Sequence, residues 1–269
     1  MSFLEIDHVS KHFPLYEGTA NGTQSEESLC VFQNVSLHVE EGEFVTLVGH
    51  SGCGKSTLLN ILAGFETASE GGMVLDGREV VEPGLDRMVV FQSFALMPWL
   101  SAFDNVRIAV KAAYPHWDRP QVDSHTQKYL TMMGLQHAGD KKPAFLSGGM
   151  RQRVGLARAF AVQPKVLLLD EPFAQIDALT RGVIQEELMK MWEGTGTTVF
   201  MVTHDVDEAI LLSDRIALMT AGPAACLAEC IDVDIPRPRR RETIIDLPQY
   251  TQLRNAVLHF LIQATPQAR

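Results

Sequence analysis

The segment that most constrains this chain runs from Gly49 to Thr57 and reads GHSGCGKST. It follows the apolar run 44–48 and precedes the largely apolar run 58–63. Its glycines let the backbone curl so that successive N–H groups point to one spot, and the following helix adds the positive end of its dipole there. The pattern predicts a strand, a loop and a helix that bind phosphate groups, with Lys55 near the terminal phosphates and the Ser56 hydroxyl available to Mg²⁺. A glycine-rich turn without a ligand would leave Lys55 unexplained.

The composition is typical of a folded protein that stays in the cytoplasm. Hydrophobic residues make up 46% of the 269 positions, enough for a substantial core. No stretch approaches the roughly 18 consecutive apolar residues of a membrane span. The first residues lead into a strand-like alternation rather than a signal peptide. We therefore expect the four cysteines, at positions 30, 53, 226 and 230, to be reduced thiols rather than disulfides or a metal site.

The charge of the chain disfavours nucleic acid as a partner. The formal net charge is −10 and the isoelectric point is near 5.4, whereas broad nucleic-acid binding needs a basic surface. The concentrated positive segment is Arg237–Arg241. We interpret it as a solvated connector stiffened by proline, and an anion or lipid site is the alternative.

Strand-like and helix-like segments alternate along most of the chain, which predicts a largely parallel sheet with helices on both faces. We expect strands at 3–6, 31–39, 44–48, 72–75, 88–91, 165–169, 197–202 and 214–219, and helices at 58–63, 102–113, 121–134, 148–162, 178–193 and 205–212. Residues 14–29 are polar and predict a loop or hairpin tip. We expect one domain over 1–235, with a helical subdomain at about 93–163 inserted in it.

The C-terminal extension, 236–269, is too short for a regulatory domain. Its apolar residues recur at helical spacing, which predicts a helix that docks on the core. They are Tyr250, Leu253, Val257, Phe260 and Leu261.

Two further segments have the pattern of phosphate chemistry. Residues 165–171 read KVLLLDE, a buried strand that ends in Asp170 and Glu171. Ligands of such sheets bind at the carboxyl ends of the strands, so Asp170 is placed to hold Mg²⁺ and Glu171 to orient the attacking water. Residues 146–153 read LSGGMRQR, in which Ser147 predicts an N-cap and a second helix N-terminus able to contact anionic oxygens.

The chain carries five elements in a fixed order: the loop 49–57, Gln92, the segment 146–153, the segment 165–171 and Thr203-His204-Asp205. This order resembles that of the ATP-binding subunit of ABC transporters. The resemblance covers about residues 3–220. It implies an α/β P-loop NTPase fold of the ABC type, with an antiparallel β subdomain and an inserted α-helical subdomain. It also implies MgATP hydrolysis by a head-to-tail dimer, in which Ser147 and Gly149 of one subunit close on the γ-phosphate held by Lys55 of the other.

The family's functional positions carry over to individual residues. Gln92 resembles the glutamine that senses Mg²⁺ and water, His204 the histidine that contacts the γ-phosphate, and Asp177 the aspartate that faces the second subunit. Phe13 stands where an aromatic ring stacks on adenine, although a core or edge-strand phenylalanine is the alternative. The implied nucleotide contacts are Phe13, Gly49, His50, Ser51, Gly52, Cys53, Gly54, Lys55, Ser56, Thr57, Ser147, Gly148, Gly149, Gln152 and Asp177. The implied metal ligands are Ser56, Gln92 and Asp170.

The segment Phe173-Ala174-Gln175-Ile176-Asp177 departs from the family's usual Gly-Ala-Leu-Asp pattern. The aspartate and the apolar residue before it are retained. The departure therefore puts the fine geometry of the inter-subunit contact in doubt rather than the activity.

Several segments narrow the resemblance to importers of nitrate, sulfonate, taurine and bicarbonate. They are His50, 82–92, 97–100, 207–215, 235–239 and 247–250. The tail is more similar to the nitrate, nitrite and bicarbonate branch, so nitrate or nitrite is the expected solute, with bicarbonate, cyanate, sulfonate or taurine as alternatives. None of these segments would touch the transported ion, so the assignment is one of lineage.

The resemblance implies that the chain works at the cytoplasmic face of a bacterial inner membrane. Its partners would be permease subunits, a second ATPase subunit of the same or a related chain, and indirectly a solute-binding protein. The region Gln92–Phe103 would face the permease, through Met97, Trp99, Leu100 and Phe103, although each of these could simply pack inside the helical insertion.

Two other classes of protein remain as alternatives. ABC-type ATPases also act in DNA repair and translation, but the region before Ser147 has no sustained heptads, the chain has one P-loop, and its charge is acidic. A stand-alone P-loop kinase or GTPase would lack the Ser-Gly-Gly-Met-Arg-Gln element. Retention on membranes together with a permease would discriminate these classes.

Overall fold

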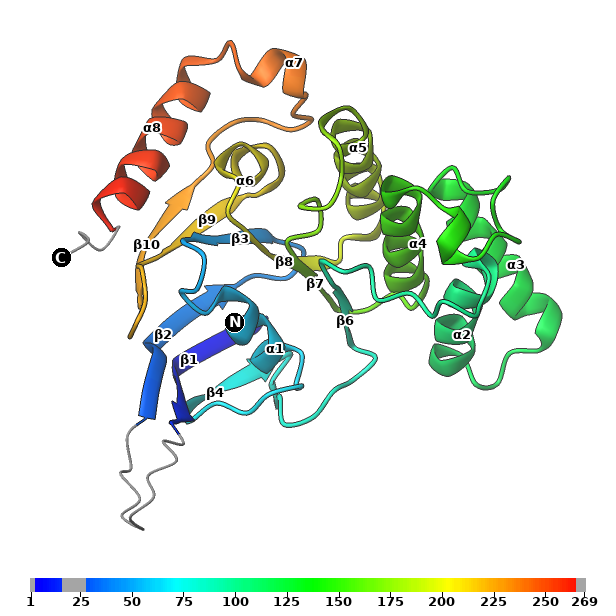
Figure 1. The fold of residues 1–269 in the computed structure, drawn as a ribbon, viewed down its shortest axis with the longest axis horizontal. Helices are drawn as coiled ribbons and strands as arrows, with labels where there is room; N and C mark the ends of the chain where they lie inside the picture. The colour runs from blue at the N-terminus through cyan, green and yellow to red at the C-terminus, as the bar shows by residue number, and fades with distance from the viewer. Residues whose placement is uncertain (1–2, 16–27, 265–269) are drawn as a thin grey trace, which may run out of the picture. The chain divides into compact units, whose positions relative to one another are not determined.

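A computed structural model describes residues 3–15 and 28–264, which fall into two units. Unit 1 takes residues 1–41, 45–82 and 202–269, and unit 2 takes 42–44 and 83–201 (Figure 1). The centre of the predicted loop, 16–27, lies outside the described residues, while Pro14 and Ser28 belong to strands that pair with each other.

Unit 1 is built on strands from both ends of the chain. Its strands are β1 (Leu4–Pro14), β2 (Ser28–Val39), β3 (Phe44–Gly49), β4 (Glu70–Leu75), β5 (Arg78–Glu79), β9 (Arg215–Met219) and β10 (Leu227–Asp232). Its helices are α1 (Lys55–Leu62), α6 (Val206–Leu212), α7 (Arg241–Ile244) and α8 (Pro248–Gln263). Strands β2, β1, β4 and β5 form an antiparallel sheet in that order, which confirms the predicted antiparallel subdomain. Strand β3 pairs in parallel with β9, and β9 pairs antiparallel with β10.

Unit 2 joins helices to a second set of strands. Its strands are β6 (Arg87–Val90), β7 (Val166–Asp170) and the first four residues of β8 (Thr198–Thr203), of which β6 and β7 run parallel. Its helices are α2 (Ala102–Ala113), α3 (Arg119–Met132), α4 (Gly148–Ala161) and α5 (Ala178–Thr195), with a 3₁₀ turn at Pro143–Phe145. Helix α3 begins two residues earlier than predicted because Asp118 and Gln121 form a capping box, and Pro120 fits the first turn.

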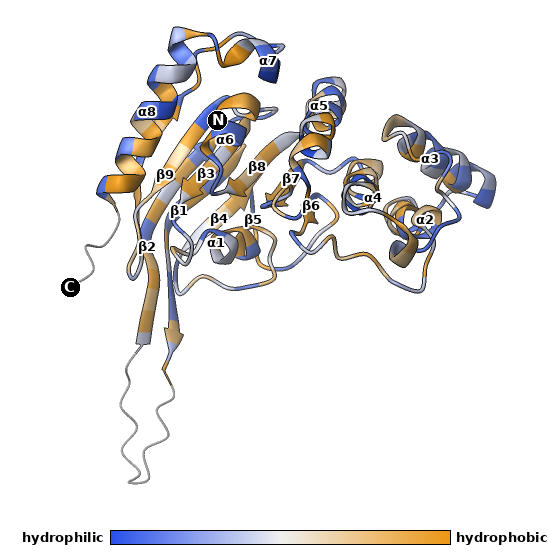
Figure 2. Cartoon of the chain, turned by 45° about the horizontal axis from the view of Figure 1, so that its top comes forward, coloured by the Kyte–Doolittle hydropathy of each residue, from blue (hydrophilic) through white to orange (hydrophobic). Residues whose placement is uncertain are grey.

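The central strands are buried along their whole length. Every residue of β3 and β8 is buried, and Figure 2 shows β3, β8 and β9 in the colours of hydrophobic residues. Such continuous runs are typical of strands covered on both faces, whereas β1 and β2 mix buried and exposed positions. Among the described residues, no helix is long and apolar enough to cross a membrane.

Helix α8 docks on the core of unit 1, as its apolar spacing predicts. Tyr250 and Val257 are buried in a cluster with residues of α6 and β9. Leu253, Phe260 and Leu261 are partly buried against the same cluster. Figures 1 and 2 both show α8 beside α6.

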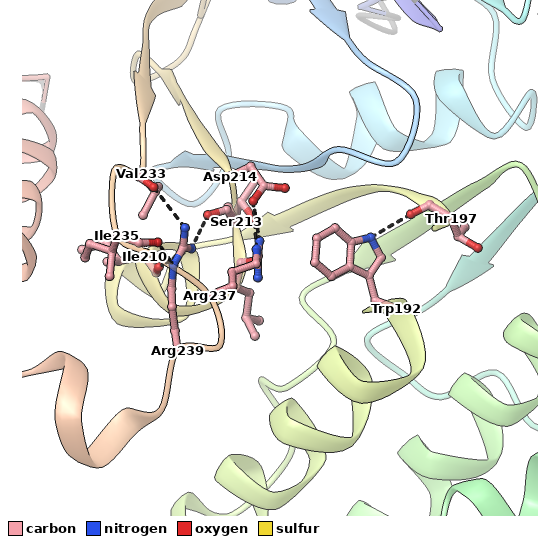
Figure 3. Close-up of polar contacts among 11 residues, drawn as sticks. Trp192, Thr197, Ile210, Ser213, Asp214, Val233, Ile235, Arg237 and Arg239 are labelled. Atoms are coloured by element: carbon pink, nitrogen blue, oxygen red, sulfur yellow. Dashed lines mark hydrogen bonds and ion pairs between the residues drawn. The ribbon is translucent and has the colours of Figure 1, made fainter. Parts of the chain in front are cut away.

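The interpretation of Arg237–Arg241 as a solvated connector is wrong for Arg237 and Arg239 (Figure 3). The Arg237 guanidinium donates to Asp214 Oδ1 at 2.7 Å and to the Leu212 carbonyl at 2.6 Å. The guanidinium of Arg239 donates to the carbonyls of Ile210, Ser213, Val233 and Ile235. Both side chains therefore satisfy carbonyl groups at the end of α6 that the helix itself leaves unpaired. Arg240 and Arg241 are exposed.

Candidate functional site

The loop 49–57 has the curled backbone that its glycines predict. Gly52 and Gly54 have φ angles of 82° and 97°, in the left-handed region that favours glycine. A Cβ on Gly54 would also come within 2.7 Å of the Val31 and Phe32 side chains, so no larger residue fits there. Helix α1 begins at Lys55, directly after this turn, so its first N–H groups open onto the loop.

Lys55 is held inside the curl by main-chain oxygens. Its Nζ donates to the Gly49 carbonyl at 2.7 Å and to the His50 carbonyl at 2.9 Å, and the residue is only 5% exposed. Cys53 is buried beside it, and burial raises the pKa of its thiol despite the nearby ammonium. Cys53 is therefore a neutral space-filling side chain at neutral pH rather than a nucleophile.

The carboxylates predicted at the end of β7 lie there. Asp170 is the last residue of the strand and is half-buried, and Glu171 follows in the left-handed region with a φ of 42°. A non-glycine residue in that region is strained, and such strain is common where a side chain must be aimed at a functional site.

The loop after β6, which begins near Gln92, is tied to α4. Phe94 and Ala95 have φ angles of 64° and 44°. The Arg158 guanidinium donates to the Ala95 carbonyl at 2.8 Å and to the Phe94 carbonyl at 3.5 Å, and burial lowers the pKa of Arg158. Arg151 lies 5.2 Å from the centre of the Phe94 ring. Both arginines come from the helix that Ser147 caps, a link with no signal in the sequence.

Ser147 caps α4 as predicted, since its Oγ accepts a hydrogen bond from the Met150 N–H at 3.3 Å. A side chain at Gly149 would clash with the neighbouring segment, and one at Gly148 would crowd it. A Cβ on Gly149 would lie 2.5 Å from Thr180 Cγ2, and one on Gly148 would lie 3.3 Å from the Gln175 carbonyl. Gln152 is fully buried on the same helix, where its amide has no hydrogen-bond partner within the described chain.

Asp177 caps α5, accepting a hydrogen bond from the Thr180 N–H at 3.0 Å. That hydrogen bond is the main reason why the pKa of Asp177 is lowered. The apolar residue before it, Ile176, is buried, whereas Gln175 is exposed. The close approach of Gly148 to Gln175 and of Gly149 to Thr180 places the start of α4 against the start of α5 within unit 2.

His204 is exposed at the end of β8, and its neighbours are fixed by hydrogen bonds. Asp205 caps α6 by accepting from the Asp207 and Glu208 N–H groups at 2.9 and 3.1 Å. The Thr203 hydroxyl donates to Glu208 Oε2 at 3.0 Å. These contacts set the direction in which the chain leaves β8 and thus where His204 lies.

Phe13 is not a core residue. Its ring is 37% exposed near the end of β1, and Lys11 Nζ lies 4.7 Å from the ring centre. Lys11 is itself anchored by Glu66 at 2.9 Å. An exposed ring with a cation over one face is compatible with stacking against a flat ligand.

The segment after Gln92 is shaped by a buried amide that sequence patterns do not reveal. The Asn105 side chain accepts from the Met97 N–H at 2.8 Å and donates to the carbonyls of Met97 and Ser101. Trp99 is 68% exposed on the loop that results, while Met97 and Phe103 are half-buried.

Comparisons with known proteins agree with this geometry. A model of the ABC transporter family matches residues 32–174. The nitrate import ATP-binding protein NrtD of Synechococcus elongatus is 48% identical, over 96% of this chain and 91% of its own length. The bicarbonate transport ATP-binding protein CmpD of Synechocystis is also 48% identical, over 97% of this chain and 89% of its own.

A solved structure has the same fold. It is the dimeric post-hydrolysis state of the ATP-binding cassette MJ0796 bound to ADP and Pi, which is 30% identical. The alignment has a TM-score of 0.74 and covers 87% of this chain and all of that one. The predicted family and fold class are thereby confirmed, and the chain belongs to the ABC transporter family as an ATP-hydrolysing cassette.

Proposed function

We propose that this chain hydrolyses ATP to drive an importer of a small oxyanion, with nitrate or nitrite as the solute. The observation that carries the proposal is the similarity to a nitrate import subunit over 96% of the chain, well beyond the 143 positions of the family match at 32–174. Bicarbonate is the second candidate, because a bicarbonate transport subunit is equally identical. Solute specificity resides in the other subunits, so the ATPase chemistry is the same in both cases.

The nucleotide would lie along the loop 49–57, with adenine against Phe13 and the phosphates over the N-terminus of α1. Lys55, already poised by carbonyl groups, would move to the β- and γ-phosphates. Each main-chain N–H of the curl adds a fixed donor, so the site needs little reorganisation when charge shifts during hydrolysis.

The residues proposed to hold Mg²⁺ suit that ion, because Ser56, Asp170 and Gln92 offer a hydroxyl, a carboxylate and an amide oxygen. When bound, Mg²⁺ neutralises charge on the phosphate oxygens. Glu171 would orient a water molecule and accept its proton as the water oxygen attacks the γ-phosphorus and the bond to ADP breaks. His204 would donate to the γ-phosphate.

A second copy would complete each site. Ser147 is exposed at the N-terminus of α4, so a phosphate held by another copy could approach the first N–H groups of this helix. Binding of ATP would then close the dimer, and hydrolysis would reopen it. The related cassette MJ0796 is dimeric in the structure described above.

The chain would act at the cytoplasmic face of the membrane, on permease subunits supplied with solute by a binding protein. The exposed Trp99 and the loop that Asn105 holds would lie in the permease contact. In this proposal residues 1–235 form the ATPase domain, about 93–163 its helical subdomain, and 236–269 an extension.

The test is the ATPase rate of the complex reconstituted with its permease and binding protein. Nitrate, nitrite, bicarbonate, cyanate and taurine are added one at a time. Stimulation by nitrate or nitrite alone supports the proposed solute, stimulation by another anion replaces it, and a complex without ATPase activity contradicts the proposal. Glu171→Gln is the control, because it should bind ATP while hydrolysis is nearly abolished.

A further inference from the structure

His50 links the phosphate loop to the C-terminal helix. Its Nε2 lies 2.7 Å from the carbonyl oxygen of Leu261, in the last turns of α8. Because a carbonyl only accepts, Nε2 carries the hydrogen and donates it. The main-chain carbonyl of the same histidine accepts from Lys55 Nζ at 2.9 Å. One residue therefore connects α8 with the lysine of the phosphate site.

Helix α8 is itself fixed at a second point. Tyr250 OH and Arg254 Nε both donate to Asp207 Oδ1 at 2.7 Å. Asp207 stands in the first turn of α6, the helix that follows His204. The same helix α8 thus contacts the element after His204 near its beginning and the phosphate loop near its end.

The rest of the extension holds α8 in place. Arg237 and Arg239 attach the preceding connector to the carbonyls at the C-terminal end of α6 (Figure 3). Val257 is fully buried and Tyr250 is 8% exposed. The extension therefore follows α6 from its end to its start, and the position of the Leu261 carbonyl is set by buried contacts rather than by a mobile tail.

We propose that His50 is a positioning residue through which α8 holds the loop 49–57 in its phosphate-binding shape and so sets the affinity for MgATP. The inference rests on the proposed role of this loop in phosphate binding. A loop released from α8 would have to be ordered by the nucleotide itself, which weakens binding without changing the groups that carry out hydrolysis.

The experiment compares full-length variants at His50. Leucine at this position (His50→Leu) removes the donor, whereas His50→Gln keeps an N–H that can reach the same carbonyl. A net hydrogen bond changes an equilibrium by about three- to tenfold, so His50→Leu should raise Kd for a fluorescent ATP analogue by about that factor. His50→Gln should recover most of it. In the reconstituted complex, His50→Leu should raise KM for ATP and change kcat less than about twofold.

The matched control is His259→Leu, which removes an exposed histidine from the same helix. It should leave Kd and KM unchanged. A purely structural role for His50 would lower the unfolding temperature of both His50 variants without the KM-selective effect or the rescue by glutamine.

The outcomes separate this inference from the proposed site. The inference is overturned if His50→Leu binds ATP with wild-type affinity, or if His50→Leu and His50→Gln lose the same amount of affinity. In either case a loss of nucleotide binding in Lys55→Ala leaves the proposed site intact. Normal nucleotide binding by Lys55→Ala would instead overturn the proposed site itself.

Discussion

Arg239 is a charged side chain whose hydrogen bonds hold separate parts of the chain together. Burial lowers the pKa of its guanidinium to about 10, and the neighbouring Arg237 charge adds to that effect, yet the group stays protonated at neutral pH. Its planar guanidinium donates to the carbonyls of Val233 and Ile235, which precede it in the chain, and to the carbonyl of Ile210 in α6. A positive charge at the C-terminal end of α6 is also favourable toward the helix dipole.

Replacement of Arg239 by lysine should destabilise the protein, because one ammonium cannot reproduce a rigid fork with several separated acceptors. We expect Arg239→Lys to lower the free energy of unfolding by about 2 kcal/mol, the cost of leaving buried carbonyls unpaired. Urea denaturation monitored by circular dichroism measures the change. Arg240→Lys, at an exposed position next to it, is the control and should stay within about 0.5 kcal/mol of the wild type. Equal stability of both variants would contradict this role.

Tyr250 should make the stability depend on alkaline pH. Burial, and then the hydrogen bond and the negative charge of Asp207, raise the pKa of Tyr250 from 10.0 to about 12. Because the folded pKa lies above the unfolded one, the contribution of Tyr250 is fully present below pH 10 and is lost as the pH rises through 12. Wild-type stability should therefore fall more steeply across this window than that of Tyr250→Phe, in urea titrations at successive pH values. Parallel slopes would show that Tyr250 is not held in its neutral form.

Helices α4 and α5 meet at their first turns, and this contact forms the surface proposed to receive a second subunit. Asp177 and Ser147 supply the two N-caps, so each helix start is fixed by its own side chain. The close approach at Gly149 then sets the distance between the two helices.

A methyl group at position 149 should push the two helices apart. Gly149→Ala places a Cβ 2.5 Å from Thr180 Cγ2, and we expect a loss of about 1–3 kcal/mol of stability through overpacking. Thr180→Ser removes that methyl group while keeping the hydroxyl, so the double variant should recover part of the loss. A double-mutant cycle from chemical denaturation measures the coupling. Additive effects would mean that the contact does not set the distance between α4 and α5.

Local signals predicted most of the elements on which the site is built. The glycines of 49–54, the apolar run before Asp170 and the N-cap at Ser147 act over a few residues, and the structure has them in place. What sequence patterns missed are polar side chains with distant partners. Arg158 is 63 residues from the carbonyl of Ala95 that it binds, and Arg239 is 29 residues from that of Ile210. An arginine that pairs with main-chain oxygens needs no acidic partner, so the sequence gives no sign of the contact. For this reason the interpretation of Arg239 as part of a solvated connector is wrong.

At the scale of the molecule, the chain presents exposed apolar residues next to a proposed interface. Leu179 is 90% exposed in the first turn of α5, two positions after Asp177. Such a residue is unremarkable alone but would be buried if a second copy covered this surface. Each copy carries a net charge of −10, so two copies repel and association needs a specific gain of free energy.

Bound ATP should supply the free energy of association between two copies when hydrolysis is blocked. Glu171→Gln with MgATP should sediment as a dimer in analytical ultracentrifugation and as a monomer without nucleotide, because the bound phosphates would bridge the two copies. Higher salt should strengthen the dimer by screening the repulsion between the acidic subunits. Adding Lys55→Ala to the same protein should prevent dimerisation, since the nucleotide would no longer be held.

The position of the interface is tested in the same background. Adding Leu179→Glu places a charge at the start of α5 and should abolish the ATP-dependent dimer while leaving nucleotide affinity unchanged. Val81→Glu, at a residue 67% exposed outside the proposed surface, adds the same charge and should dimerise normally. If both charged variants dimerise alike, the second copy covers another face, because a carboxylate forced into the contact must either lose its hydration or hold the subunits apart.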